Sequence, residues 1–140
     1  MAIRKWLQPG LILVLVLGGA ALAPSAPPEG KQPPWKQAEA KAEAARQACL
    51  ALAQEYADGR ATLEQVSQWS RRWKDAQRNT TSKRSEQVAA EEDHVRRMQQ
   101  VEAKAKERVA AKRAQPSEAY AAEYYRIEAE MALAQLKTGK

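Results

Sequence analysis

Apolar residues recur at alternating intervals of three and four between residues 35 and 56, a spacing that places them on one stripe of a helix. Asp58 and Gly59 predict where this helix ends, because glycine suits the left-handed residue that follows a helix terminus. The stripe is rich in alanine, so a neighbouring helix can approach it closely. The stripe consists of Trp35, Ala38, Ala42, Ala45, Cys49, Leu52 and Tyr56.

A second helix is predicted directly after the first. Thr62 and Gln65 have the spacing of a capping box, in which each side chain bonds the backbone N–H of the other residue. Because the connection is short, with its tip at residues 59–61, residues 35–78 are expected to form an antiparallel helical hairpin. The predicted inner face of the second helix is Leu63, Val66, Ser70, Trp73 and Gln77, with Trp69 beside it.

The polar residues 79–82 leave two arrangements open. They either separate a second helix from a third or belong to one continuous helix over residues 62–113, and we favour a break or kink near Asn79. The following stretch has a thin apolar stripe at near-heptad spacing. That stripe consists of Val88, Val95, Met98, Val101 or Glu102, Ala105 and Val109.

Proline at position 116 predicts the start of a last helix, because proline is well placed in a first helical turn. Its apolar stripe again alternates between intervals of four and three, and consists of Tyr120, Tyr124, Ile127, Met131 and Ala134, with Leu133 and Leu136 alongside. The fold class that follows is all-α, with residues 35–140 forming antiparallel helical hairpins or a small extended bundle of three to four helices.

A weak internal echo relates the two halves of this helical region. Arg60-Ala61 and Arg113-Ala114 are fifty-three positions apart, and Asp75-Ala76 matches Glu128-Ala129 at the same offset without a gap. Two duplicated helix-turn-helix units explain the echo. Chance similarity between alanine-rich amphipathic helices explains it equally well.

The N-terminal 23 residues are typical of a bacterial export signal. Arg4 and Lys5 precede an apolar run and a small-residue exit, which together are expected to direct the chain to the periplasm or cell envelope. Pro24 follows the Ala-x-Ala exit and disfavours cleavage, so a membrane anchor retained over residues 6–23 is the alternative. Its apolar run is shorter than the roughly 20 residues that a spanning helix needs. Residues 24–34 are expected to be an extended proline-rich linker.

Composition points away from an enzyme. The chain has no Phe and few Gly, and it is rich in Ala, Glu, Lys, Arg and Gln, as in long solvent-exposed helices. It carries 23 Lys and Arg against 17 Asp and Glu, and removal of residues 1–23 takes away two basic residues and leaves a net charge of +4. We find no nucleophile and base pair, phosphate-binding loop or paired catalytic carboxylates, and we expect no cofactor.

Neither of the two single residues with reactive side chains predicts a site. Cys49 is the only cysteine, lies on the apolar stripe and is expected to behave as a small core residue, with an intermolecular disulfide as the lesser alternative. His94 is the only histidine and is expected to be solvated, because a metal site needs several converging ligands and its neighbours along a helix point elsewhere.

Basic residues interleaved with tryptophan follow the capping box. Such a cluster can bind anionic lipid headgroups or acidic partners, whereas export argues against nucleic acid. The alternative is that the tryptophans lie in the helix interface and the basic residues on the solvated face. The cluster consists of Trp69, Arg71, Arg72, Trp73, Lys74, Arg78, Lys83 and Arg84.

Two family resemblances bear on function. The run from Tyr56 to Val66 resembles the hairpin tips of TolC-type outer-membrane efflux proteins, and Tyr124 to Glu130 is similar to the helices that follow those tips. That likeness implies a periplasmic helical hairpin whose tip meets a partner protein, although the chain lacks the strands of a barrel and is too short for the duplicated domain. Thr62-Leu63-Glu64-Gln65 is similar to the motif of Spy and CpxP, periplasmic helical chaperones and stress or metal sensors, but Ala61 replaces its leucine and the second copy is missing.

These observations predict an exported scaffold or protein-interaction module that associates with a partner or with itself through helical faces. A Spy-like chaperone or sensor and a peripheral binder of anionic membranes are the alternatives. The candidate partner-binding residues are Gly59, Arg60, Thr62, Trp69, Arg71 and Arg72.

Overall fold

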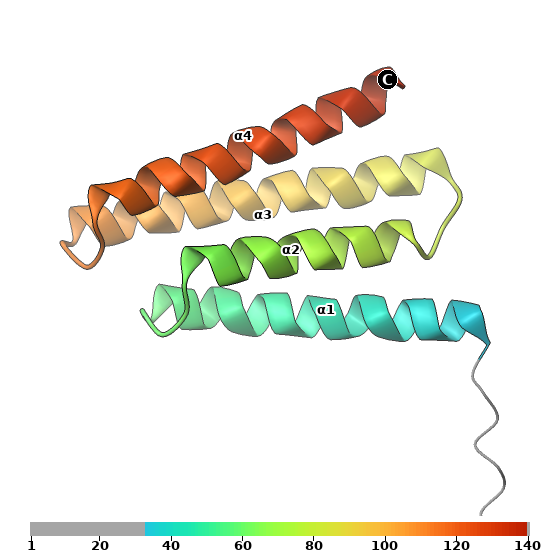
Figure 1. Cartoon of the computed structure of the whole chain (residues 1–140), viewed down its shortest axis with the longest axis horizontal. Coiled ribbons are helices and arrows are strands. Elements are labelled where there is room, and N and C mark those ends of the chain that lie inside the picture. Colours follow the sequence, from blue (N-terminus) through green and yellow to red (C-terminus); the bar gives the residue numbers. More distant parts are fainter. Residues whose placement is uncertain (1–32, 140) are drawn as a thin grey trace, which may run out of the picture. The chain divides into compact units, whose positions relative to one another are not determined.

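The computed structural model describes residues 33–139, and these residues form α-helices and connecting turns without strands (Figure 1). The all-α prediction is therefore confirmed for this part of the chain. The predicted export signal or anchor and nearly all of the predicted linker lie outside the described residues. The helices are α1 (Pro34–Ala57), α2 (Leu63–Arg78), α3 (Arg84–Ala110) and α4 (Pro116–Thr138).

Each helix packs against its neighbour in the chain. α1 contacts α2, α2 contacts α3, and α3 contacts α4, while α2 and α4 touch only slightly. The short turns make successive helices antiparallel, so both predicted hairpins are present (Figure 1). The favoured break near Asn79 is confirmed as well, because α2 ends at Arg78 and α3 begins at Arg84.

Local side-chain chemistry sets the first hairpin turn. The hydroxyl of Thr62 accepts a hydrogen bond from the backbone N–H of Gln65 (3.2 Å), and the Gln65 side chain accepts one from the N–H of Thr62 (2.8 Å). Gly59 has a φ of +80°, a conformation that costs glycine little and other residues about 1–2 kcal/mol. The capping box and the glycine stop are therefore confirmed.

The second hairpin repeats the first at the offset of fifty-three residues. The first helices of the two hairpins end at Ala57 and Ala110, and the second helices begin at Leu63 and Pro116. Lys112, the counterpart of Gly59, has a φ of +56°. The backbone N–H three residues past each helix end donates to the carbonyl five residues before it in both turns, at 2.7 and 2.8 Å. The two turns thus share one hydrogen-bonded geometry, as duplicated units would.

The apolar core lies where both hairpins meet. It joins Tyr56 at the end of α1 to the start of α2, the middle of α3 and the alanine face of α4. Trp35, predicted to lie on the inner stripe of α1, is instead 58% exposed, since it occupies the first turn of α1, outside the core. The core residues are Tyr56, Ala61, Leu63, Val66, Val95, Met98, Val101, Ala105, Ala122 and Ala129.

Candidate functional site

The predicted tip residues lie in and beside the turn between α1 and α2. Arg60 is exposed and forms an ion pair with Asp58 (2.9 Å). Gly59 serves the turn through its positive φ, and Thr62 serves it as the helix cap. Their local roles account for the residue types at Gly59 and Thr62 without a partner.

The basic cluster does not form one surface. Arg71 forms an ion pair with Glu128 of α4 (2.5 Å), whereas the guanidinium of Arg72 lies 4.7 Å from the centre of the Trp69 ring. Trp69 and Arg72 line a groove of about 440 Å³ between α1 and α2, with Lys41, Ala44, Asp75 and Ala76 among its other residues. Of the predicted partner-binding residues in this cluster, Arg71 therefore contacts α4, whereas Trp69 and Arg72 line the groove between α1 and α2.

His94 is buried between α2 and α3, so the prediction that it is solvated is wrong. Its Nδ1 lies 2.8 Å from Oγ of Ser70, a side chain with no exposed surface. Nε of Arg97 donates to the same Ser70 oxygen at 2.8 Å, which leaves the hydroxyl proton of Ser70 free to point at a neutral imidazole. Burial, with Lys74, Arg97 and Arg71 nearby, lowers the pKa of His94 to about 3.

The Ser70 and His94 pair is a contact that sequence reasoning missed, because the two residues are distant in the chain and come from different helices. Both side chains are buried, and the guanidinium of Arg97, which donates to Ser70, lies 3.9 Å from the centre of the Trp73 ring. The pair thus joins α2 to α3, at a place that a dissolved substrate does not reach.

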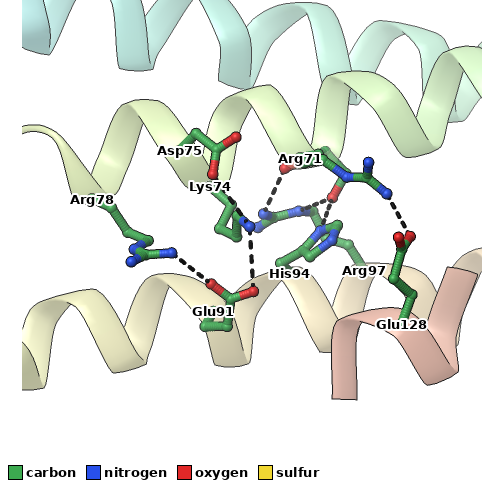
Figure 2. Close-up of polar contacts among 9 residues, drawn as sticks. Arg71, Lys74, Asp75, Arg78, Glu91, His94, Arg97 and Glu128 are labelled. Carbon is green, nitrogen blue, oxygen red and sulfur yellow. Dashed lines mark hydrogen bonds and ion pairs between the residues drawn. The ribbon is translucent and has the colours of Figure 1, made fainter. Parts of the chain in front are cut away.

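A buried carboxylate completes this polar interface. Glu91 on α3 is 1% exposed and contacts Lys74 (3.3 Å) and Arg78 (3.5 Å) on α2, as Figure 2 shows. Figure 2 also shows the Arg71 to Glu128 contact, which extends the same interface to α4. A buried charge persists only when it is paired, so these contacts fix how the second hairpin lies on the first.

Cys49 is free and 2% exposed on α1, as expected for a small core residue. Burial raises the pKa of its thiol, which opposes formation of the reactive thiolate. Beside it, the C-terminal half of α1 and the middle of α3 line an apolar groove of about 200 Å³, with Leu50 and Lys104 among its lining residues.

The large apolar side chains of the stripe predicted from the periodicity of α4 lie on its outer face, away from the core. Tyr120, Tyr124, Ile127 and Met131 are 71%, 63%, 42% and 58% exposed. The opposite face packs against the core through the small residues Ala122 and Ala129 and the partly buried Tyr125 and Leu133. Periodicity therefore identified one of two apolar faces of α4, and the core contacts the other one.

Ion pairs fix this rotation of α4. Arg126 contacts Glu102 of α3 (2.5 Å) and Glu130 of its own helix (2.6 Å), while Glu128 contacts Arg71 of α2. Rotating α4 to bury the tyrosines would break the bonds to both neighbouring helices. We call the exposed set Tyr120, Tyr124, Ile127 and Met131 the α4 stripe, and it is the strongest candidate binding surface among the described residues.

Two classes of site are not found within residues 33–139. No group of three or more His, Cys, Asp and Glu side chains there converges as metal ligands would, and none of the helices in this range has the length and apolar character needed to cross a membrane.

Comparison with family models, curated proteins and solved structures gave no match to this chain.

Proposed function

We propose that this chain is an exported, non-enzymatic interaction module of the cell envelope, and that it binds a helix of its partner along the α4 stripe. The observation that carries the proposal is the exposure of four large apolar side chains on one face of a well-packed helix. Single exposed apolar residues are ordinary, but a contiguous apolar patch is typical of a binding surface.

The spacing of the α4 stripe suits a helical partner. Its members follow one another at intervals of four, three and four, the pattern by which an amphipathic helix lies in a groove. An aromatic side chain offers about 150–250 Å², so Tyr120 and Tyr124 at their observed exposures present roughly 250 Å² between them. At about 25 cal/mol per Å², covering that area supplies roughly 6 kcal/mol, before the entropy of association is subtracted.

Acidic side chains flank the α4 stripe and favour a partner with basic or small residues. Glu123 and Glu130 lie beside Arg126, which contacts both of them. The contact between Glu123 and Arg126 is long, at 3.9 Å, and the Glu123 side chain is 46% exposed, so its carboxylate is accessible to a partner. A basic side chain of the partner could therefore form a second ion pair with Glu123 at the edge of the patch.

Location in the cell envelope rests on the predicted export signal. Intact-mass measurement of the protein isolated from periplasmic and membrane fractions tests this part of the proposal. Loss of the mass of about the first 21–23 residues is expected for signal cleavage, and the full mass in the membrane fraction is expected for the anchored form. Recovery of the full-length chain in the cytosol contradicts the proposal.

Site-specific photocrosslinking tests the binding surface in intact cells. A benzoylphenylalanine at position 124 should give a discrete crosslinked product, whereas the same group at Gln99, an exposed position on α3, should give none. A third variant at Arg60 tests the hairpin tip that the TolC resemblance implies. Crosslinks from positions 60 or 99 without one from 124 refute binding through the α4 stripe.

The α4 stripe also favours a second candidate, a chaperone that holds unfolded clients as Spy-type proteins do. Such a chaperone would suppress light scattering by an aggregating client, and Tyr124→Glu would abolish that effect. Equal suppression by the variant, or none by the unaltered protein, counts against this alternative.

A further inference from the structure

The duplicated hairpins show how the fold buries a face like the α4 stripe. α2 lies on the second hairpin, where Ser70 contacts His94 and Arg97 of α3 and Arg71 contacts Glu128 of α4. This is the interface between the two repeats. Each of its residues can be replaced by its counterpart fifty-three positions earlier or later in the chain, which shows where an equivalent interface would lie.

Transfer toward the N-terminus leads to a groove that is already present. The counterparts of His94, Arg97 and Glu128 in the first hairpin are Lys41, Ala44 and Asp75. All three line the groove of about 440 Å³ between α1 and α2. We call it the α1–α2 groove, and it corresponds to the place that α2 occupies on the second hairpin.

Transfer toward the C-terminus leads to the α4 stripe. The stripe of α2 that carries the ion pairs to the second hairpin consists of Ser67, Arg71, Lys74 and Arg78, and their counterparts are Tyr120, Tyr124, Ile127 and Met131. Ser67 is 4% exposed and the other three form ion pairs to the second hairpin. The α4 stripe therefore occupies the positions of the second repeat that correspond to this contact face of α2.

Building on the proposed function, we propose that the partner is a second copy of this chain, whose α1–α2 groove receives the α4 stripe. The stack of hairpins then continues from one molecule to the next, with α4 of one copy lying on the next copy as α2 lies on α3 and α4 within each copy.

The transferred contacts are chemically compatible. The Ser70 to His94 contact becomes Glu123 opposite Lys41 of the second copy, an ion pair. The Arg71 to Glu128 pair becomes Tyr124 opposite Asp75, in which the phenol can donate to the carboxylate. The contacts of Lys74 and Arg78 with Glu91 become Ile127 and Met131 over Ala38, which are large apolar side chains over a small one.

The geometry makes this interface heterologous, because the two surfaces in contact are different. A growing stack has an unused α4 stripe at one end and an unused α1–α2 groove at the other. Association therefore continues to open chains or closes into a ring, rather than stopping at a symmetric dimer. A symmetric pairing of two α4 stripes would instead end at a dimer, which makes the two arrangements distinguishable.

Sedimentation velocity of the purified protein over a wide range of concentrations tests the proposal. The unaltered chain should form species larger than a dimer. Ile127→Glu, which destroys the α4 stripe, and Ala44→Glu, which obstructs the α1–α2 groove, should each be monomeric while keeping the helical circular dichroism spectrum. Both altered positions are exposed, so neither substitution disturbs the core.

Mixing the two variants gives the decisive result. Ile127→Glu keeps its α1–α2 groove and Ala44→Glu keeps its α4 stripe, so an equimolar mixture should form a one-to-one dimer and nothing larger. Lys41→Glu and Glu123→Lys should each weaken association of the full chain, and their combination should restore it. Leu50→Glu is the matched control, because it places the same acid in the other groove, between α1 and α3, and should leave association unchanged.

Three outcomes overturn the proposal. They are a monomeric protein at every concentration, undiminished self-association of Ala44→Glu, and loss of association in Leu50→Glu alone. The first would leave the proposed function standing if position 124 still crosslinks to another protein in cells. A protein that is monomeric at every concentration and also gives no crosslink from position 124 would reject the α4 stripe as a binding surface.

Discussion

Lowering the pH from 7 to 5 is expected to destabilise the fold through His94. Its imidazole is neutral in the folded protein because burial lowers its pKa from 6.5 to about 3, and the nearby cations Lys74, Arg97 and Arg71 act in the same direction. The unfolded chain therefore takes up the proton first. Stability is complete above the unfolded pKa of 6.5 and falls as the pH drops from there toward 3.

The expected magnitude follows from the two pKa values. Each pH unit between them changes the free energy of unfolding by about 1.4 kcal/mol, and curvature near pH 6.5 reduces the total between pH 7 and pH 5 to about 2 kcal/mol. Carboxylates such as Glu102, whose pKa is lowered by a hydrogen bond from Lys106, lose their contribution at lower pH. The window from pH 7 to pH 5 therefore reports mainly on His94.

Urea unfolding followed by tryptophan fluorescence at several pH values measures this loss. His94→Gln is the control, because glutamine can bond Ser70 without taking up a proton, and its unfolding free energy should change little over the same range. Equal pH dependence in both proteins refutes the assignment. So does an imidazole NMR signal from the folded protein that titrates near 6.5, since a buried neutral His94 cannot do so.

Three further substitutions test the interface and the turns. Glu91→Ala removes the buried partner of Lys74, which keeps only its contact with Asp75 (3.2 Å), and should cost about 3 kcal/mol in urea unfolding. The double variant Lys74→Met with Glu91→Leu should recover most of it, and a small loss in the single variant refutes the pairing. Lys112→Gly should raise the free energy of unfolding by up to about 1 kcal/mol while Gly59→Ala lowers it by about 1 kcal/mol, and effects of the same sign contradict the shared turn geometry. Thr62→Ala should cost about 1 kcal/mol in thermal unfolding, and an unchanged midpoint excludes the cap.

The sequence alone determined the helices and their ends. The capping box at Thr62, the glycine at position 59 and the proline at position 116 act within a few residues of the chain. Their effect can therefore be predicted without knowledge of the tertiary contacts. The polar residues 79–82 likewise marked the break between α2 and α3. The offset of fifty-three residues was visible too, and the structure adds that the turns at Gly59 and Lys112 share one hydrogen-bonded geometry.

Tertiary structure decided which faces of the helices are covered. α4 has two apolar faces, and periodicity cannot choose between bulky Tyr120 and Tyr124 on one side and Ala122 and Ala129 on the other. The choice depends on close approach to α3 and on ion pairs to residues far away in the chain. His94 shows the same limit, because its burial requires Ser70 from another helix. The sequence specifies each helix locally, whereas the contacts that select its buried face exist only once the hairpins have packed.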